Sequence, residues 1–321
     1  MTTYKEVVGS AVLDYAGNLP NVLEGQVWYN STAKDFRLNT PLVGAWATGN
    51  NMNTARTSMG DAGTQTAALA FGGSFPQKNE TETYNGTNWT EVNNLNTARY
   101  ALAGLGTQTA ALAFGGDANS GSPEIFNGTE IWNGTNWTEV NNLNTARIAT
   151  AGCGTTTAAL AFGGRPGAKN ETEVWNGTNW TEVNNLTTAR GRLSGAGTST
   201  AALAFAGLAP DDEPTDLTES WNGTNWTEVN DLNTARKAGA GVGTYTAALA
   251  FGGRASDTDL AITETWNGTN WTEVADLNTG RRYLAGAGTN TAALAFGGDS
   301  GSATAATEEW SIGGGIKTIA S

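Results

Sequence analysis

The deciding stretch of this sequence runs from Asn53-Thr-Ala-Arg56 through Ala67-Ala-Leu-Ala-Phe71-Gly-Gly73 to Tyr84-Asn-Gly-Thr-Asn-Trp89-Thr-Glu-Val92. Nearly the same phrase returns along the chain, and its arginine recurs six times, at Arg56, Arg99, Arg147, Arg190, Arg236 and Arg281. These arginines are 43 to 48 residues apart. A period in that range is typical of solenoids, repeat arrays and propellers.

The composition favours strands within each copy of the repeat. The 321 residues include 43 glycines and 7 prolines, and Thr, Val, Trp and Phe are spread through every copy. Glycine is unfavourable in helix interiors, whereas β-branched and aromatic residues suit short strands. Because one repeat runs through most of the chain, we expect a single closed all-β body over residues 45–312. Residues 1–44 precede it, and residues 313–321 are expected to form a C-terminal tail.

Charge and residue types argue against several functions. The net charge is −13 and no long basic run is present, so neither nucleic acid nor an anionic membrane is an expected partner. No apolar stretch is long enough to cross a bilayer, so membrane insertion is not expected. Histidine is absent, which removes the commonest general base and the commonest metal ligand. We therefore expect no catalytic residue, metal or cofactor, and we expect Cys153 to be a small core residue.

Each copy contains two segments that read as the first strands of a sheet. In the second copy these are Ala101–Gly106, whose small residues suit a crowded position near an axis, and Thr109–Phe114. Alternation along Thr109–Phe114 places Leu and Phe side chains on one face and two alanines on the other. The bulky face of one sheet can therefore pack on the alanine face of the next.

Two further strands follow in each copy and form a hairpin. In the second copy they are Thr129–Trp132 and Trp137–Val140, separated by Asn133-Gly-Thr-Asn136. Asn-Gly between β-prone segments is a strong hairpin signal because these residues accept the positive φ of tight turns. Each copy is thus expected to make four antiparallel strands.

The order of these signals resembles the kelch repeat. An arginine precedes the first strand, Gly-Gly ends the second, and an aromatic residue and a tryptophan follow, over roughly Trp46–Trp310. The resemblance implies an all-β fold, a six-bladed kelch-like β-propeller with four-stranded blades. The departures from the kelch pattern are modest. Ala206-Gly207 replaces one Gly-Gly, Thr187 replaces the Asn of one Asn-Thr-Ala-Arg, and Gly280 replaces the Ala of another. The spacing from the aromatic residue to the tryptophan is also shorter than usual for kelch repeats.

The tryptophans predict how the ring closes. The fourth strands of five copies begin with Trp89, Trp137, Trp180, Trp226 and Trp271, whereas the sixth copy has Trp310 and no fourth strand after it. Upstream, the segment from Trp46 to Arg56 aligns without a gap with the segment from Trp89 to Arg99. We therefore expect a strand near Trp46 to pair with Thr307–Trp310, which also removes an exposed sheet edge. Ile316–Ile319 is the competing candidate for that position.

Variation between the copies is concentrated in one connection. From the end of Gly-Gly to the next aromatic residue the spacing is 11, 16, 11, 14, 13 and 12 residues. In a propeller this connection and the link that carries the repeated arginine share one rim, which makes these loops candidates for recognition. Neutral drift in loops that tolerate insertion is the alternative explanation. The candidate binding residues are Phe75, Gln77, Lys78, Asp117, Asn119, Arg165, Lys169, Asp211, Asp212, Arg254, Asp257 and Asp299.

The repeated arginines have mainly a structural interpretation. Each is expected to stack on a tryptophan or to pair with a fourth-strand glutamate such as Glu91, Glu139 or Glu182. An anion site at the channel mouth is the alternative. The acidic loops at residues 211–213 and 257–259 lack the ligand spacing of a calcium loop, so we expect them to be solvated.

Residues 1–44 lie outside the repeat. Within them Glu24-Gly-Gln-Val-Trp28-Tyr-Asn-Ser-Thr32 and Asp35-Phe-Arg-Leu38 predict a short hairpin. This phrase resembles one that is common in structural and tail proteins of bacteriophages, especially marine ones. The resemblance implies a virion protein made in the host cytoplasm: a fibre, tail or capsid-surface component without enzymatic activity.

Two partner surfaces follow from that resemblance. Residues 1–44 would contact other virion proteins or mediate homo-oligomerisation. The variable rim would bind a host-surface glycan or protein, or a neighbouring virion subunit. A bacterial kelch-type protein-interaction scaffold is the alternative function, and an enzyme ranks third.

Overall fold

The computed structural model describes residues 13–18, 25–74, 76–118 and 125–319. Within these residues the regular structure is β-strand, and no helix is long and apolar enough to cross a membrane. The chain separates into two compact units, one of Trp46–Ser311 and one of Met1–Ala45 with Ile312–Ser321. Residues 313–319 of the expected C-terminal tail continue β28 (Thr307–Ile319) and are grouped with residues 1–45.

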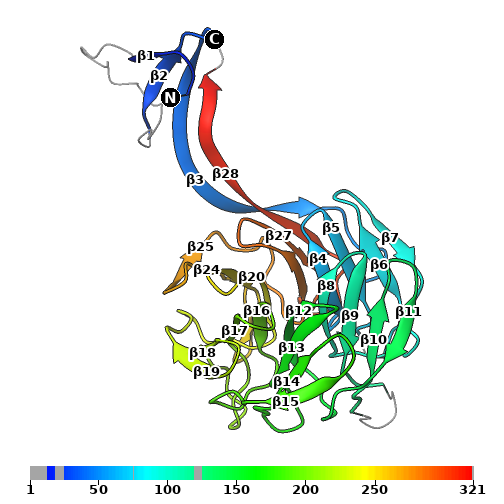
Figure 1. The fold of residues 1–321 in the computed structure, drawn as a ribbon. Coiled ribbons are helices and arrows are strands. Elements are labelled where there is room, and N and C mark those ends of the chain that lie inside the picture. Colours follow the sequence, from blue (N-terminus) through cyan, green and yellow to red (C-terminus); the bar gives the residue numbers. More distant parts are fainter. Residues whose placement is uncertain (1–12, 19–24, 75, 119–124, 320–321) are drawn as a thin grey trace. The chain divides into compact units, whose positions relative to one another are not determined.

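The larger unit consists of repeated four-stranded antiparallel sheets, consistent with a propeller, in which the first strands lie inside and the fourth strands outside (Figure 1). The first strands are β4 (Gly60–Thr64), β8 (Ala103–Thr107), β12 (Ala151–Thr155), β16 (Ser194–Gly197), β20 (Ala240–Thr244) and β26 (Ala285–Gly288). The second strands are β5 (Ala67–Phe71), β9 (Ala110–Phe114), β13 (Ala158–Phe162), β17 (Ala202–Phe205), β21 (Ala247–Phe251) and β27 (Ala292–Phe296).

The third and fourth strands complete each sheet on its outer side. The third strands are β6 (Thr81–Tyr84), β10 (Thr129–Trp132), β14 (Thr172–Trp175), β18 (Thr218–Trp221), β24 (Thr263–Trp266) and β28 (Thr307–Ile319). The fourth strands are β7 (Trp89–Val92), β11 (Trp137–Val140), β15 (Trp180–Val183), β19 (Trp226–Val229) and β25 (Trp271–Val274). A small ribbon of β22 (Arg254–Ala255) and β23 (Thr258–Asp259) lies in the fifth variable connection.

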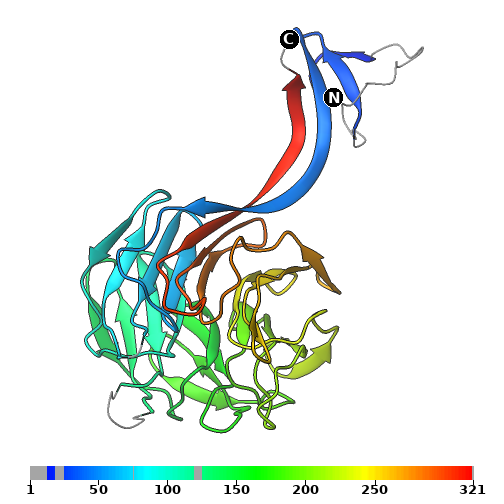
Figure 2. The same ribbon diagram turned by 180° about the vertical axis from the view of Figure 1, so that it is seen from behind.

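The last sheet combines strands from both ends of the chain. Four strands of this six-stranded sheet are consecutive neighbours in the order β26-β27-β28-β3, so β3 (Asp35–Gly49) lies beside β28, as both ribbon views show (Figure 2). The ring centroids of Trp46 and Trp310 are 5.5 Å apart. The predicted proximity of Trp46 to the strand at Thr307–Trp310 is therefore confirmed. Residues 316–319 continue β28 and do not take the fourth position.

The predicted strands of the second copy agree with the structure to within two residues. The hairpin strands β10 and β11 have the predicted bounds. The first strand begins at Ala103 and not at Ala101, because Ala101 has a φ of 51°, in the left-handed region. In the hairpin turn Gly134 has a φ of 91°, and Asn133 Oδ1 accepts hydrogen bonds from the backbone N–H groups of Thr135 and Asn136.

Neighbouring sheets pack through the predicted bulky and flat faces. Leu112 and Phe114 of β9 lie in one buried cluster with Ala159 and Ala161 of β13. The same arrangement joins each sheet to the following one, and one cluster joins the sheet of β27 to that of β5. Glycine is required in the first strands by this packing, since a Cβ on Gly152 would lie 2.5 Å from Phe114 Cζ.

The smaller unit contains the predicted hairpin. β2 (Val27–Asn30) pairs antiparallel with the start of β3, in the register that sets Val27 opposite Leu38 and Asn30 opposite Asp35. β1 (Leu13–Tyr15) pairs parallel with β2. The Trp28 side chain is fully buried, and its Nε1–H donates to the Gly17 carbonyl at 3.3 Å.

Candidate functional site

The variable connections and the arginine-bearing links meet at one edge of the sheets. In five of the six copies the residue after Gly-Gly, or after Ala206-Gly207 in the fourth copy, forms a β-bridge with the residue after the repeated arginine, as in Tyr100 with Asp117 and Arg282 with Asp299. The predicted common rim therefore agrees with the backbone pairing. Two candidate residues, Phe75 and Asn119, lie outside the described residues.

The described rim candidates differ in how available they are to a ligand. Asp117 is 3% exposed and accepts hydrogen bonds from Tyr100 and Gln77, so it anchors its loop and offers little surface. Asp211 and Asp212 are exposed. Six of the candidates take part in four ion pairs, which join Lys78 to Glu80, Lys169 to Glu171, Arg165 to Asp212, and Arg254 to Asp257.

The acidic loops do not gather into a metal site. Among the described residues no group of three or more Cys, Asp or Glu side chains is arranged to hold a metal ion. Asp257 instead pairs with Arg254, while Asp259 and Asp299 both contact Arg282, at 2.8 and 3.0 Å. These contacts tie the rim loops to the links beside them.

The repeated arginines are buried and pair with a glutamate of the third strand. Their partners are Glu82, Glu130, Glu173, Glu219, Glu264 and Glu308. The prediction that fourth-strand glutamates are the partners is wrong, since Glu91, Glu139 and Glu182 are exposed. Because each of the six arginines is at most 1% exposed, an anion site formed by them is also excluded.

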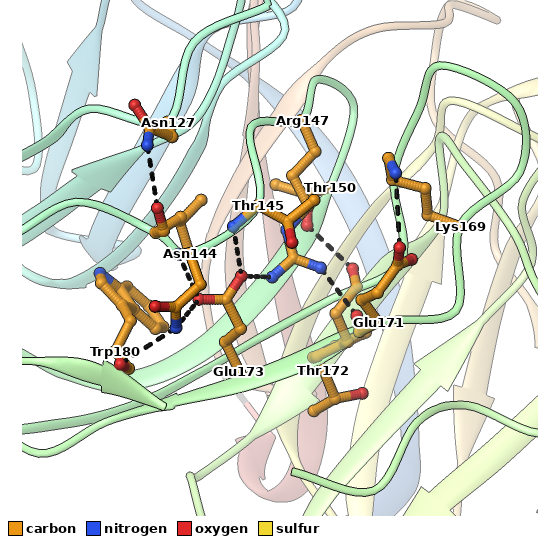
Figure 3. Close-up of polar contacts among 12 residues, drawn as sticks. Asn127, Asn144, Thr145, Arg147, Thr150, Lys169, Glu171, Thr172, Glu173 and Trp180 are labelled. Atoms are coloured by element: carbon orange, nitrogen blue, oxygen red, sulfur yellow. Dashed lines mark hydrogen bonds and ion pairs between the residues drawn. The ribbon is translucent and has the colours of Figure 1, made fainter. Parts of the chain in front are cut away.

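The third-strand glutamate fixes the whole link between sheets. In the third copy (Figure 3) Glu173 accepts Arg147 Nη2–H at 2.6 Å and the backbone N–H groups of Asn144 and Thr145 at 2.8 and 3.3 Å. Arg147 Nη1 also donates to the Glu171 carbonyl at 2.7 Å. Burial lowers the pKa of Arg147, and Glu173 opposes that shift. The network is structural because every member is used to hold the link.

A ring of backbone hydrogen bonds surrounds the inner edge of the rim. The second residue after each repeated arginine has a φ of 50–57°, and its N–H donates to the corresponding carbonyl of the preceding copy at 2.7–2.9 Å. The cycle is complete, since Ser58 N–H donates to the Tyr283 carbonyl. We call this the backbone ring; its members are Ser58, Ala101, Ala149, Arg192, Ala238 and Tyr283.

The backbone ring surrounds a cavity of about 370 Å³, which we call the mouth cavity. Small and aliphatic side chains make up much of its lining, and Tyr100, Arg165, Arg192, Tyr283 and Asp299 provide the aromatic and charged part. A smaller central cavity of about 150 Å³ continues from it along the first strands. The mouth cavity is of the size that small-molecule sites occupy, about 300–1,000 Å³.

The central cavity contains one carboxyl group, that of Asp61. The other five copies have glycine there, at Gly104, Gly152, Gly195, Gly241 and Gly286. Asp61 Oδ2 accepts the Gly286 N–H at 3.0 Å. Burial raises the pKa of Asp61 to about 7, and this hydrogen bond partly opposes the shift.

Sequence reasoning missed Arg192, Tyr283 and Asp61. Comparison of equivalent positions holds the signal, because Arg192 and Tyr283 stand where three other copies have alanine, and Asp61 stands where five have glycine. No protein-family model matches the chain, and no curated protein matches it either. The fold and these positions are therefore the basis for a functional proposal.

Proposed function

We propose that the larger unit is a six-bladed β-propeller closed by β3. Three cyclic sets of contacts support this. The backbone ring links all six copies. Each second-strand phenylalanine packs against a fourth-strand tryptophan of the next sheet, including Phe251 with Trp46 and Phe296 with Trp89. Trp46 Nε1–H donates to Thr263 Oγ1 at 3.0 Å, as the other fourth-strand tryptophans do to equivalent threonines.

We propose that this propeller is a non-enzymatic binding module of a bacteriophage particle, in a fibre, tail or capsid-surface component. The observation that carries the proposal is the contrast between a constant scaffold and connections that vary in length and charge around one cavity. A rigid frame with variable loops is the usual arrangement of a recognition surface. The expected ligand is a host-surface glycan or protein, or a neighbouring virion subunit.

The smaller unit is proposed to attach the protein to other virion proteins or to further copies of itself. Most of the exposed large apolar side chains among the described residues belong to it, including Phe36, Leu42 and Val43 at 45%, 71% and 59% exposure. A unit of this size buries little apolar surface alone, and such exposure is typical of an interaction surface.

Two measurements test the proposal. Mass spectrometry of purified phage particles should detect the chain, whereas a chain found only in bacterial cytoplasm would favour the kelch-type interaction scaffold. For the rim, a glycan array and host-cell binding should give a signal that falls when the loop at Arg254–Asp259 is replaced by alanines. Replacement of the opposite-edge hairpin tip at Thr135 and Asn136 is the matched control and should leave binding unchanged.

A further inference from the structure

Arg192 differs from the other arginines of the chain. Every other arginine forms an ion pair with an aspartate or glutamate in the described structure. Arg192 forms neither an ion pair nor a side-chain hydrogen bond among the described residues. Its guanidinium carbon lies 5.5 Å from the ring centroid of Tyr283, in a cation–π contact. In a protein of net charge −13, a guanidinium without a carboxylate partner is unusual.

The position of Arg192 directs this charge to the mouth cavity. Arg192 belongs to the backbone ring, so its main chain is fixed by hydrogen bonds to Ala149 and Ala238. It lines the mouth cavity together with two other charged side chains that already have partners, Arg165 and Asp299. The cavity therefore contains one arginine that is held in place and available to an acidic ligand.

The rest of the lining suits a compact ligand with hydroxyl groups. The lining residues Thr57, Ser58 and Tyr283 carry hydroxyl groups, and Leu102, Leu193 and Leu284 add apolar surface. The continuation along the first strands is smaller, about 150 Å³ against about 370 Å³, so the site suits the end of a chain better than its middle. The overall acidity of the protein disfavours a dense polyanion.

We propose that the mouth cavity binds a terminal sugar residue that carries one carboxylate, with Arg192 as the group that pairs with the carboxylate. Tyr283 holds the guanidinium from one side, and the hydroxyl groups of the lining bond to those of the sugar. This inference rests on the proposed role of the rim in glycan binding and specifies its ligand. A charge-assisted pair with arginine is among the strongest polar contacts available to such a site.

The test uses the full chain and isothermal titration with soluble probes. These are the methyl glycosides of N-acetylneuraminic acid and glucuronic acid, with methyl glucoside as the uncharged counterpart of the latter. Arg192→Ala is expected to fold normally, because alanine occupies the same left-handed position at Ala101, Ala149 and Ala238. At least one acidic glycoside should bind, and Arg192→Ala should weaken that binding about tenfold or more. Arg37→Ala, which removes a paired arginine of the smaller unit and not of the rim, should leave it unchanged.

Several outcomes would overturn the inference. These are the absence of binding by both acidic glycosides, equal binding by the acid and its uncharged counterpart, and binding that survives Arg192→Ala. Binding of sodium sulfate or an acidic peptide, but of neither acidic glycoside, would reject the sugar while retaining Arg192 as an anion contact. If the glycan-array and host-cell signals persist in Arg192→Ala, the rim still binds a host surface, and only the inference that the mouth cavity binds an acidic sugar is contradicted. Binding by the variant with the replaced Arg254–Asp259 loop tests the proposed function of the rim and not the acidic sugar.

Discussion

Replacement of Trp46 by alanine tests whether β3 is an integral strand of the last sheet. Trp46 is 7% exposed, lies 5.0 Å from Phe251 and 5.5 Å from Trp310 between ring centroids, and bonds to Thr263. Removal of a buried tryptophan side chain typically costs about 3–5 kcal/mol, since apolar contacts are lost and a cavity remains. The unbonded Thr263 hydroxyl adds to that cost.

Trp180→Ala is the matched control. Trp180 is 5% exposed, packs on Phe114 and Trp175 at 5.0 and 5.4 Å, and bonds to Thr129 at 3.1 Å. Its strand is joined to its own sheet by a four-residue turn, whereas the strand of Trp46 reaches its sheet from the other end of the chain. Urea unfolding of the full chain, followed by tryptophan fluorescence and circular dichroism, should give similar losses for both variants. A loss below about 1 kcal/mol for Trp46→Ala beside about 3 kcal/mol or more for Trp180→Ala would refute the closure.

Three further substitutions probe the interior. Arg147→Met should lower the free energy of unfolding in urea by about 3–5 kcal/mol, because it leaves Glu173 buried without its cation. Arg165→Ala, which removes an exposed ion pair, is the control and should lower it by about 1 kcal/mol or less. Equal losses in the two variants would contradict this prediction. Gly152→Ala should cost about 1–3 kcal/mol through its clash with Phe114, and an unchanged unfolding midpoint would count against the packing. Because the pKa of Asp61 is raised to about 7, the free energy of unfolding of the wild type should fall by up to about 4 kcal/mol as the pH rises from about 4 through 7. Asp61→Gly should remove this fall. A difference in stability between the two proteins that does not change with pH would disprove the prediction.

The sequence was most informative where one copy of the repeat could be compared with another. The ungapped match between Trp46 and Trp89 located the strand that joins the last sheet, although more than two hundred residues separate it from that sheet. Alternation within Thr109–Phe114 was enough to predict which face packs on the neighbour, because side chains alternate along any strand.

The partner of the repeated arginine was beyond this kind of comparison. Glu82 and Glu91 are both repeated and lie opposite each other on adjacent strands. Periodicity therefore cannot distinguish them. The difference arises in three dimensions, because the link that precedes β4 folds over the third strand and directs the N–H groups of Asn53 and Thr54 at Glu82.

The candidate ligand contact was hidden for another reason. Arg192 lies in the link that follows the repeated Arg190, outside the connections in which length variation was visible between copies. Its importance depends on the absence of an ion-pair partner among the described residues and on the hydrogen bonds of the backbone ring, neither of which a sequence pattern contains. The loops Phe75–Asn79 and Asp117–Asn127 are only partly described, so their contribution to the rim stays a prediction.

The placement of β3 beside β28 also sets an order of events during synthesis. The ribosome makes β3 among the first strands, yet its neighbour β28 follows some 260 residues later. At roughly 5–20 residues per second, the early strand waits about 13–52 s for its partner. During that interval the indole of Trp46 and the edge of β3 lack their native cover, so a newly made chain is most prone to pair with another nascent copy before its last strand emerges.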